Sequence, residues 1–298
     1  MATHEVQAAA AVVRKPTDEE LDVYGLTHPG KVRTENQDHF LVASLHRQMR
    51  VHLTSLPALG GTTVNTDRLA FLAMVADGVG GGFAGEEASR FALEAIAGFV
   101  NNSAHCFYTA DASDDEAFRA TLESAALSVH EELTLRSEQL PGRRGMATTL
   151  TLFLGVWPRV YLLQVGDSRY YMLRDGELTQ VTRDQTMAQE LIDLGVISRT
   201  DQKASRLSNI LSSAIGGTQT APVVTGVQND WGMVHLLCSD GLTRHVSDER
   251  IRERLRAMTS SREVCEQLLQ DALDGGGKDN VTVIVGRAVR RETEGGAR

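Results

Sequence analysis

The sequence contains few cysteines, few prolines and no long apolar run. Its 298 residues include six prolines and only three cysteines, Cys106, Cys238 and Cys265. Scattered cysteines without a Cys-x-x-Cys pair argue against a disulfide scaffold and against a zinc site. No apolar stretch approaches the ~18 residues that a membrane-spanning helix needs. Acidic Glu5 precedes the apolar Val6–Val13 and basic residues follow it, the reverse of a secretory signal, so we expect a cytoplasmic protein without membrane insertion.

Positive charge is also in short supply. The chain has 30 Lys+Arg against 39 Asp+Glu, a net charge of −9, which argues against nucleic acid as a partner. Hydrophobic residues at 42% and charged residues at 23% are typical of a globular protein, and the length fits one large domain. We expect a mobile N-terminal tail over 1–20, a single domain over 21–290 and a C-terminal tail over 291–298.

Strand patterns dominate this domain, and many of the predicted strands are joined by short turns. The dipeptide Asp175-Gly176 between two of them is typical of a tight hairpin. Short connections favour antiparallel pairing. The predicted strands are Leu21–Thr27, Asp38–Leu45, Leu69–Ala76, Thr149–Val156, Val160–Val165, Arg169–Arg174, Glu177–Thr182, Val223–Val227, Met233–Cys238 and Val281–Val285.

Helical periodicity occurs in two adjacent pairs of segments. The first pair is Gly85–Val100 and Asp114–Leu135; the second begins after the N-cap Ser247 and continues with Arg262–Leu273. Strands therefore outnumber helices, which predicts an α+β fold of two packed antiparallel sheets with helix pairs outside. Two long segments interrupt the pattern. Residues 46–66 are interpreted as a hairpin loop, and residues 185–217 as an extended segment with a helix at Met187–Leu194.

Five aspartates lie where predicted strands begin or end. Asp77, Asp167 and Asp240 follow strands, whereas Asp38 opens one and Asp279 precedes another. A single aspartate at such a place is ordinary turn chemistry. If these strand ends converge, each close carboxylate pair repels by ~4 kcal/mol at an effective dielectric near 20. Such a cluster needs protonation or cations, and carboxylate ligands suit Mg²⁺ or Mn²⁺.

Arg33 lies five residues before Asp38, where its planar guanidinium could bind two oxygens of a phosphate. A solvated surface arginine is the alternative interpretation. The glycines at 80, 82 and 85 also fit the dinucleotide pattern G-x-G-x-x-G. Asp77 would repel a pyrophosphate there, and the next segment is helical rather than a strand with an acidic end, which argues against that pattern.

A phosphocysteine mechanism is the nucleophilic alternative. Cys238 and Cys265 lie in apolar runs, and Cys106 is followed by Phe-Tyr rather than by a loop that could hold a phosphate. Buried, unreactive thiols are therefore the expected role of these cysteines.

Six short motifs occur in one order along the chain. They are Gly30-x-x-Arg33-x-x-Asn36-Gln37-Asp38, Ala76-Asp77-Gly78-Val79-Gly80-Gly81, Gly145-Met146-Ala147-Thr148-Thr149-Leu150, Gly166-Asp167-Ser168-Arg169, Ser239-Asp240-Gly241-Leu242 and Lys278-Asp279-Asn280-Val281-Thr282. Together they resemble the metal-dependent (type 2C, PPM) protein serine/threonine phosphatases, and the bacterial branch most closely. The resemblance spans residues 30–282.

This resemblance implies a four-layer α-β-β-α sandwich and hydrolysis of phosphoserine or phosphothreonine on proteins by a water that bridges two Mn²⁺ or Mg²⁺ ions. Arg33 would bind the substrate phosphate. The implied metal ligands are Asp77 between the two ions, the Gly78 carbonyl on one of them, Asp240 and Asp279 on the other, Asp38 through water, and Asp167 with Asp240 at a third ion. Asp38, Asp77 and Asp240 would form the catalytic group.

The implied partners are phosphoproteins, together with a serine/threonine kinase and its substrates. The segment 185–217 would be the flap beside the active site. Two other functions stay open: a catalytically silent regulatory protein, which should lack one of Asp77, Asp240 and Asp279, and a phosphatase for small phosphate esters. Val79 occupies a position where some family members carry a histidine that can protonate the leaving group, so the source of that proton is open as well.

Overall fold

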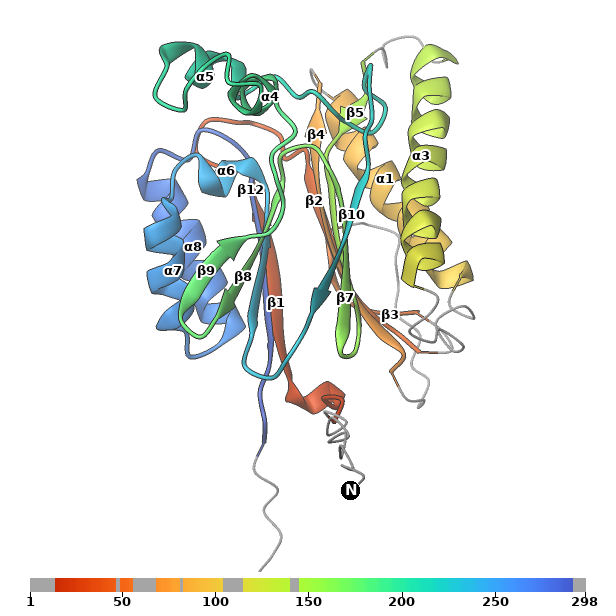
Figure 1. Cartoon of the computed structure of the whole chain (residues 1–298), viewed down its shortest axis with the longest axis vertical. Coiled ribbons are helices and arrows are strands. Elements are labelled where there is room, and N and C mark those ends of the chain that lie inside the picture. The colour runs from red at the N-terminus through yellow and green to blue at the C-terminus, as the bar shows by residue number, and fades with distance from the viewer. Residues whose placement is uncertain are drawn as a thin grey trace, which may run out of the picture.

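Two antiparallel sheets face each other, and a pair of helices covers the outer face of each (Figure 1). The computed structural model describes residues 14–46, 49–55, 68–80, 83–103, 115–139 and 145–291. The predicted α-β-β-α sandwich is confirmed. Among the described helices, none combines the length and apolar character needed to cross a bilayer.

The first sheet has the strand order β1-β12-β11-β8-β9, and the second has the order β10-β7-β6-β4-β2-β3, with β5 paired to β4. All of the pairings are antiparallel, as the short connections predicted. The strands are β1 (Leu21–His28), β2 (Asp38–Leu45), β3 (Met49–Thr54), β4 (Ala70–Val79), β5 (Ala147–Thr148), β6 (Leu150–Val156), β7 (Arg159–Val165), β8 (Arg169–Arg174), β9 (Glu177–Gln180), β10 (Val223–Gln228), β11 (Val234–Cys238) and β12 (Val281–Ala288).

Helices α1 (Phe83–Asn102) and α3 (Asp115–Gln139) cover the second sheet, and α7 (Asp248–Arg256) and α8 (Ser261–Asp274) cover the first. The predicted N-cap is confirmed, since the Ser247 side chain accepts a hydrogen bond from the Arg250 backbone. Three short helices, α4 (Met187–Asp193), α5 (Gln202–Leu207) and α6 (Asp240–Thr243), lie at the end of the sandwich opposite the first described residues (Figure 1).

Apolar side chains fill all three interfaces between the four layers. Phe40, Phe153 and Ile284 pack between the two sheets, and separate clusters lie beneath each helix pair. Strand β2 is buried over its whole length because it is an inner strand covered on both faces. Burial on both faces explains why its sequence is an almost continuous apolar run without polar alternation.

The structure differs from the sequence expectations mainly at the edges of elements. Asp175 and Gly176 both have positive φ, 51° and 82°, as the predicted hairpin requires. The segment 46–66 contains the edge strand β3, which its polar sequence did not indicate. Residues 14–20 include a short 3₁₀ helix, and Glu20 is buried. The rest of the expected tails (1–13 and 292–298), residues 56–67 of the loop and the Cys106 region lie outside the described residues.

A close backbone approach joins α6 to the start of β12. A Cβ atom on Gly241 would overlap the carbonyl oxygen of Asn280. Only glycine therefore lets α6, which begins with Asp240, pack directly beside the segment that carries Asp279.

We predict that Gly241→Ala lowers the free energy of unfolding by about 1–3 kcal/mol, the usual effect of forcing extra volume into a packed site. The matched control is Gly98→Ala, because Gly98 is an exposed residue inside α1 with no atom near its would-be Cβ. It should stabilise the protein by about 0.5–1 kcal/mol through helix propensity. Urea unfolding followed by circular dichroism measures both, and equal stability of the two variants would contradict the packing argument.

Candidate metal centre

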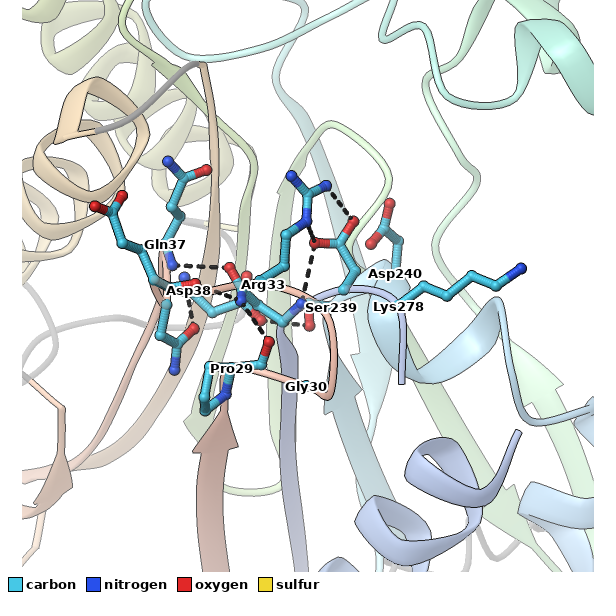
Figure 2. A network of polar contacts seen from close by, with 12 residues as sticks. Pro29, Gly30, Arg33, Gln37, Asp38, Ser239, Asp240 and Lys278 are labelled. Atoms are coloured by element: carbon cyan, nitrogen blue, oxygen red, sulfur yellow. Dashed lines mark hydrogen bonds and ion pairs between the residues drawn. The ribbon is translucent and has the colours of Figure 1, made fainter. Parts of the chain in front are cut away.

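The five aspartates do converge, at the end of the sandwich where α4, α5 and α6 lie. Asp38 and Asp77 are direct partners across β2 and β4, Asp240 begins α6 directly after β11, and Asp279 precedes β12. Asp167 lies in the turn between β7 and β8. Four of them line a cleft of about 680 Å³, and Asp38 is buried next to its partner Asp77. The lining includes Arg33, Asp77, Gly78, Asp167, Asp240, Arg244, Asp279 and Asn280. Figure 2 shows Arg33, Asp38, Ser239 and Asp240 gathered there from separate segments.

Asp38 lies deepest in the cluster and is only 1% exposed. Its Oδ2 accepts hydrogen bonds from Ser239 Oγ and Thr282 Oγ1, both at 2.7 Å. Its Oδ1 is buried and has no hydrogen-bond partner among the described residues. Leaving a buried acceptor unpaired costs about 1–3 kcal/mol, and more when the group is charged. This oxygen is therefore a ready acceptor for a water molecule or a cation.

Two threonines hold the backbone of Asp77. The Asp77 amide donates to Thr149 Oγ1 at 3.0 Å, and Thr148 Oγ1 donates to the Asp77 carbonyl at 2.9 Å. The next residue, Gly78, donates its amide to the Gln37 carbonyl at 3.1 Å, and a Cβ there would overlap the Gly85 carbonyl. The hydrogen-bonding residues of the Thr148-Thr149 motif thus fix one ligand candidate, and the absence of a side chain on Gly78 permits the close approach of α1.

Asn280 fastens the loop that carries Arg33 to the start of β12. Its side-chain amide donates to the carbonyls of Pro29 (3.0 Å) and Glu35 (2.8 Å), and its Oδ1 accepts from the Gln37 amide at 2.8 Å. Figure 2 labels two of these partners, Pro29 and Gln37, near Arg33 and Asp38. One buried side chain therefore positions the loop relative to both Asp38 and Asp279.

Burial and mutual repulsion raise the pKa values of the clustered carboxyls. Burial raises the pKa of Asp38 to about 7, of Asp167 to about 8 and of Asp240 to about 6, and neighbouring carboxylates add to each increase. Burial also raises the pKa of Asp77 well above its ordinary value, and the charges of the other four aspartates act in the same direction. The cluster is therefore a site that favours bound cations or protons.

Two arginines face the outer carboxylates. Arg33 forms a bidentate pair with Asp279, with Nε 2.9 Å from Oδ1 and Nη2 3.0 Å from Oδ2. Arg244 contacts Asp240 through Nη2 and lies 3.4 Å from Asp279 Oδ2 through Nη1. Across the described part of the chain, no three acidic, histidine or cysteine side chains form a ready set of metal ligands. Instead, Asp240 and Asp279 form ion pairs with the two guanidinium groups.

The residues present nevertheless fit a divalent metal centre. The donors are hard oxygen atoms, carboxylates and the Gly78 carbonyl, which suit Mg²⁺ or Mn²⁺ rather than zinc. The unpaired Asp38 Oδ1 and the guanidinium partners of Asp240 and Asp279 both mark places that receive positive charge. Asp38, Asp77, Asp167, Asp240 and Asp279 would hold the ions together with Gly78.

Sequence reasoning did not find three supporting features of this site. The motifs contain Ser239, Thr282 and Asn280 but do not indicate what these residues bind. In the structure, Ser239 and Thr282 donate hydrogen bonds to Asp38, and Asn280 holds the loop. Arg244 was not considered at all. Its spacing of four residues after Asp240, at the start of a short helix, was the available signal, since side chains four residues apart lie on one helix face.

Comparison with known proteins places this chain in a family. The model of the protein phosphatase 2C family matches residues 58–275, and the chain belongs to that family. The matched region includes Asp77, Asp167 and Asp240 but not Arg33, Asp38 or Asp279. The structure brings these residues together, because Arg33 and Asp279 line the same cleft as the three matched aspartates and Asp38 pairs with Asp77 across β2 and β4.

Two bacterial relatives illustrate the range of similarity. The chain is 38% identical over 223 residues to the serine/threonine protein phosphatase PstP of Mycobacterium tuberculosis, an alignment that covers 74% of this chain and 41% of PstP. It is 33% identical over 227 residues to the serine/threonine phosphatase stp of Listeria monocytogenes, covering 76% of this chain and 87% of stp. The chain thus spans about two fifths of the length of PstP.

Solved structures of PstP share the fold. A crystal structure of the M. tuberculosis phosphatase superimposes with a TM-score of 0.70 at 32% identity, covering 91% of this chain and 99% of that chain. The structure of the PstP catalytic domain in complex with two manganese ions gives a TM-score of 0.68 at 33% identity, with the same coverage of 91% and 99%.

The raised pKa values make a prediction about pH. A carboxyl with a raised pKa binds more protons in the folded than in the unfolded protein, so stability falls as pH rises through the folded pKa. In chelator, we expect the melting temperature to fall between pH 6.5 and 8, the range of the pKa values near 7 and 8 of Asp38 and Asp167. Added Mn²⁺ should remove most of this fall, as calorimetric melting would show.

The buried histidines do not oppose this loss of stability between pH 6.5 and 8. Burial lowers the pKa of His39 and of His235 to about 4, so the stability that depends on these neutral histidines is lost only as pH falls below about 6.5. The matched variant Asp38→Asn removes one titrating carboxyl and should flatten the slope above pH 6.5. A melting temperature that rises with pH in chelator would show that the carboxyls are not held close together.

Proposed function

We propose that this chain hydrolyses phosphoserine and phosphothreonine in proteins and depends on Mn²⁺ or Mg²⁺. The observation that supports this most directly is that four aspartates and Arg33 line one cleft, with the buried Asp38 paired to one of the four, Asp77, across neighbouring strands. The names of its relatives, serine/threonine protein phosphatases, indicate the substrate class. The two manganese ions named in the PstP complex support a centre with at least two ions.

Bound divalent ions would supply a water of lowered pKa and neutralise charge on the phosphoryl oxygens. The protein's own residues prepare the rest of the site. The planar guanidinium group of Arg33 lines the cleft and binds both carboxylate oxygens of Asp279. The same geometry suits two oxygens of a substrate phosphate. Asp38, fixed through Oδ2, keeps Oδ1 available to accept a hydrogen bond from the attacking water.

The leaving alkoxide needs a proton, and the cleft offers no side-chain acid at the position next to Gly78. Val79 occupies it and has no proton to give, although it is 40% exposed at the cleft. We propose that the proton comes from water. Asp167 lies in the same cleft, and burial and the charge of Asp240 raise its pKa. We propose that Asp167 and Asp240 together hold a third ion.

The segment 185–217 is proposed as the flap that shapes substrate choice. It forms α4 and α5, and Met187, Glu190 and the stretch 209–214 line one wall of the cleft. The Thr186 side chain caps α4 by accepting from the Gln189 amide, which fixes that wall. The proposed partners are phosphoproteins, and with them a serine/threonine kinase whose products this chain would dephosphorylate.

The direct test is release of phosphate from a phosphothreonine peptide by the purified chain. We expect turnover with Mn²⁺ or Mg²⁺, none in chelator, and loss of at least about 100-fold in kcat for Asp77→Asn. The control variant is Asp230→Asn, which changes an exposed loop aspartate away from the cleft. Turnover in chelator, or none with any divalent cation, would refute the proposal, and faster turnover of small phosphate esters than of peptides would assign a different substrate class.

A second test addresses Arg33. At saturating Mn²⁺, Arg33→Ala should raise KM for the phosphopeptide about tenfold or more and lower kcat less, because it removes a charge-assisted bidentate contact to the phosphate. Arg33→Lys keeps the charge but loses the fork and should recover only part of the affinity. An unchanged KM in Arg33→Ala would mean that Arg33 serves only to balance Asp279.

A further inference from the structure

Arg244 has a place in the cleft that the proposed function does not explain. It follows helix α6 as its C-terminal cap residue, four positions after Asp240, and its side chain lines the cleft beside Arg33. The guanidinium pairs with Asp240 Oδ2 through Nη2 and with Asp279 Oδ2 through Nη1. It therefore joins two of the carboxylates that are proposed to hold metal.

Asp240 is largely buried and depends on Arg244 for charge compensation. The Asp240 side chain is 12% exposed, and Arg244 is the only cationic side chain within ion-pair distance of it among the described residues. Two other arginines near the cluster form ion pairs with other carboxylates. Arg169 forms a bidentate pair with Asp184 at 2.8 and 2.7 Å, and Arg33 is bidentate on Asp279.

We infer that Arg244 is an internal counter-ion that competes with divalent metal for Asp240 and Asp279, and thereby sets the metal concentration at which the centre fills. This inference rests on the proposed metal-dependent function and assigns its regulation to one residue. The competition is electrostatic, because a guanidinium group in contact with Asp240 Oδ2 and near Asp279 Oδ2 already neutralises part of the negative charge that would attract a metal ion.

The charge of Arg244 acts on both the metal-free and the metal-bound cluster, and both effects oppose metal binding. The guanidinium stabilises the cluster before an ion binds, since it offsets repulsion between Asp240 and its neighbours. It also repels an ion that has bound, because it is tethered by a short helix and remains within a few ångströms of the site. Both effects weaken metal binding, so removal of the charge should strengthen it.

Geometry distinguishes Arg244 from Arg33. Among the residues that the structure describes, Arg33 forms an ion pair only with Asp279, and it comes from a loop that Asn280 attaches to the start of β12. Arg244 is the C-cap residue of the short helix that Asp240 begins, and it bridges two ligand candidates. Arg33 is thus suited to exchange its carboxylate for a phosphate, whereas Arg244 is suited to control entry of the metal.

The experiment is a calorimetric titration of Mn²⁺ into the full chain. Wild type is compared with two neutral variants, Arg244→Gln and Arg244→Ala, and with the charge-retaining Arg244→Lys. The control is Arg252→Ala, which alters a half-buried arginine on α7 whose Nη1 lies 3.9 Å from Glu177 Oε2. The neutral variants should bind Mn²⁺ roughly threefold to tenfold more tightly, the range expected for loss of a partly exposed charge pair. Arg244→Lys should stay near wild type.

Melting in chelator gives a second readout that does not depend on activity. The neutral variants should melt at a lower temperature than wild type without metal and gain more on addition of Mn²⁺, whereas Arg252→Ala should follow wild type. Equal or weaker Mn²⁺ binding by both neutral variants would overturn the inference and leave the proposed function intact. A raised KM for phosphopeptide with unchanged Mn²⁺ affinity would likewise overturn it, and would assign Arg244 to substrate binding. Absence of Mn²⁺ binding by wild type would refute the proposed function itself.

Discussion

Repulsion between buried carboxylates is the constraint that the rest of this structure satisfies. Asp38 and Asp77 are cross-strand partners, and the charges of Asp167, Asp240 and Asp279 all act on Asp77. Several kinds of interaction reduce the free-energy cost of this repulsion. Hydroxyl donors bind Asp38, two guanidinium groups face the outer aspartates, and raised pKa values allow protonation. A protein that keeps so much like charge together needs a reason, and binding of divalent cations supplies one.

The scaffold keeps the cluster in place with backbone contacts that tolerate no side chain. Gly78 and Gly241 lie where a Cβ would meet a carbonyl oxygen of a neighbouring segment, so β4 and α6 approach α1 and β12 closely. Asn280 then ties the loop before β2 to the start of β12. The site therefore combines residues from both sheets, and the rigidity of the sandwich, rather than any local motif, sets the spacing of the aspartates.

Much of this could be predicted from the sequence because the strands are short, apolar and bounded by turn residues. β2 and β8 have the predicted bounds, since each begins and ends at a sharp change from polar to apolar residues. The aspartates stood out because several lay at strand ends. β3 was missed because Met49–Thr54 is an edge strand with polar residues, whose pairing with β2 depends on tertiary contact. The supporting role of Asn280 was missed for a similar reason, since its partners lie more than 240 residues away.

Charge balance links the two ligands that the proposed reaction requires. Arg33 and Arg244 both approach Asp279 Oδ2, so they share one carboxylate between them. If Asp279 were to bind a divalent ion, the Arg33 guanidinium would be free to pair with a phosphate dianion in the cleft. Metal and phosphate would then favour each other's binding, and by thermodynamic linkage the favourable coupling would be equal in both directions. The two arginines would divide these effects, because Arg244 opposes metal entry and Arg33, once released from Asp279, would attract a phosphorylated substrate to the loaded cleft.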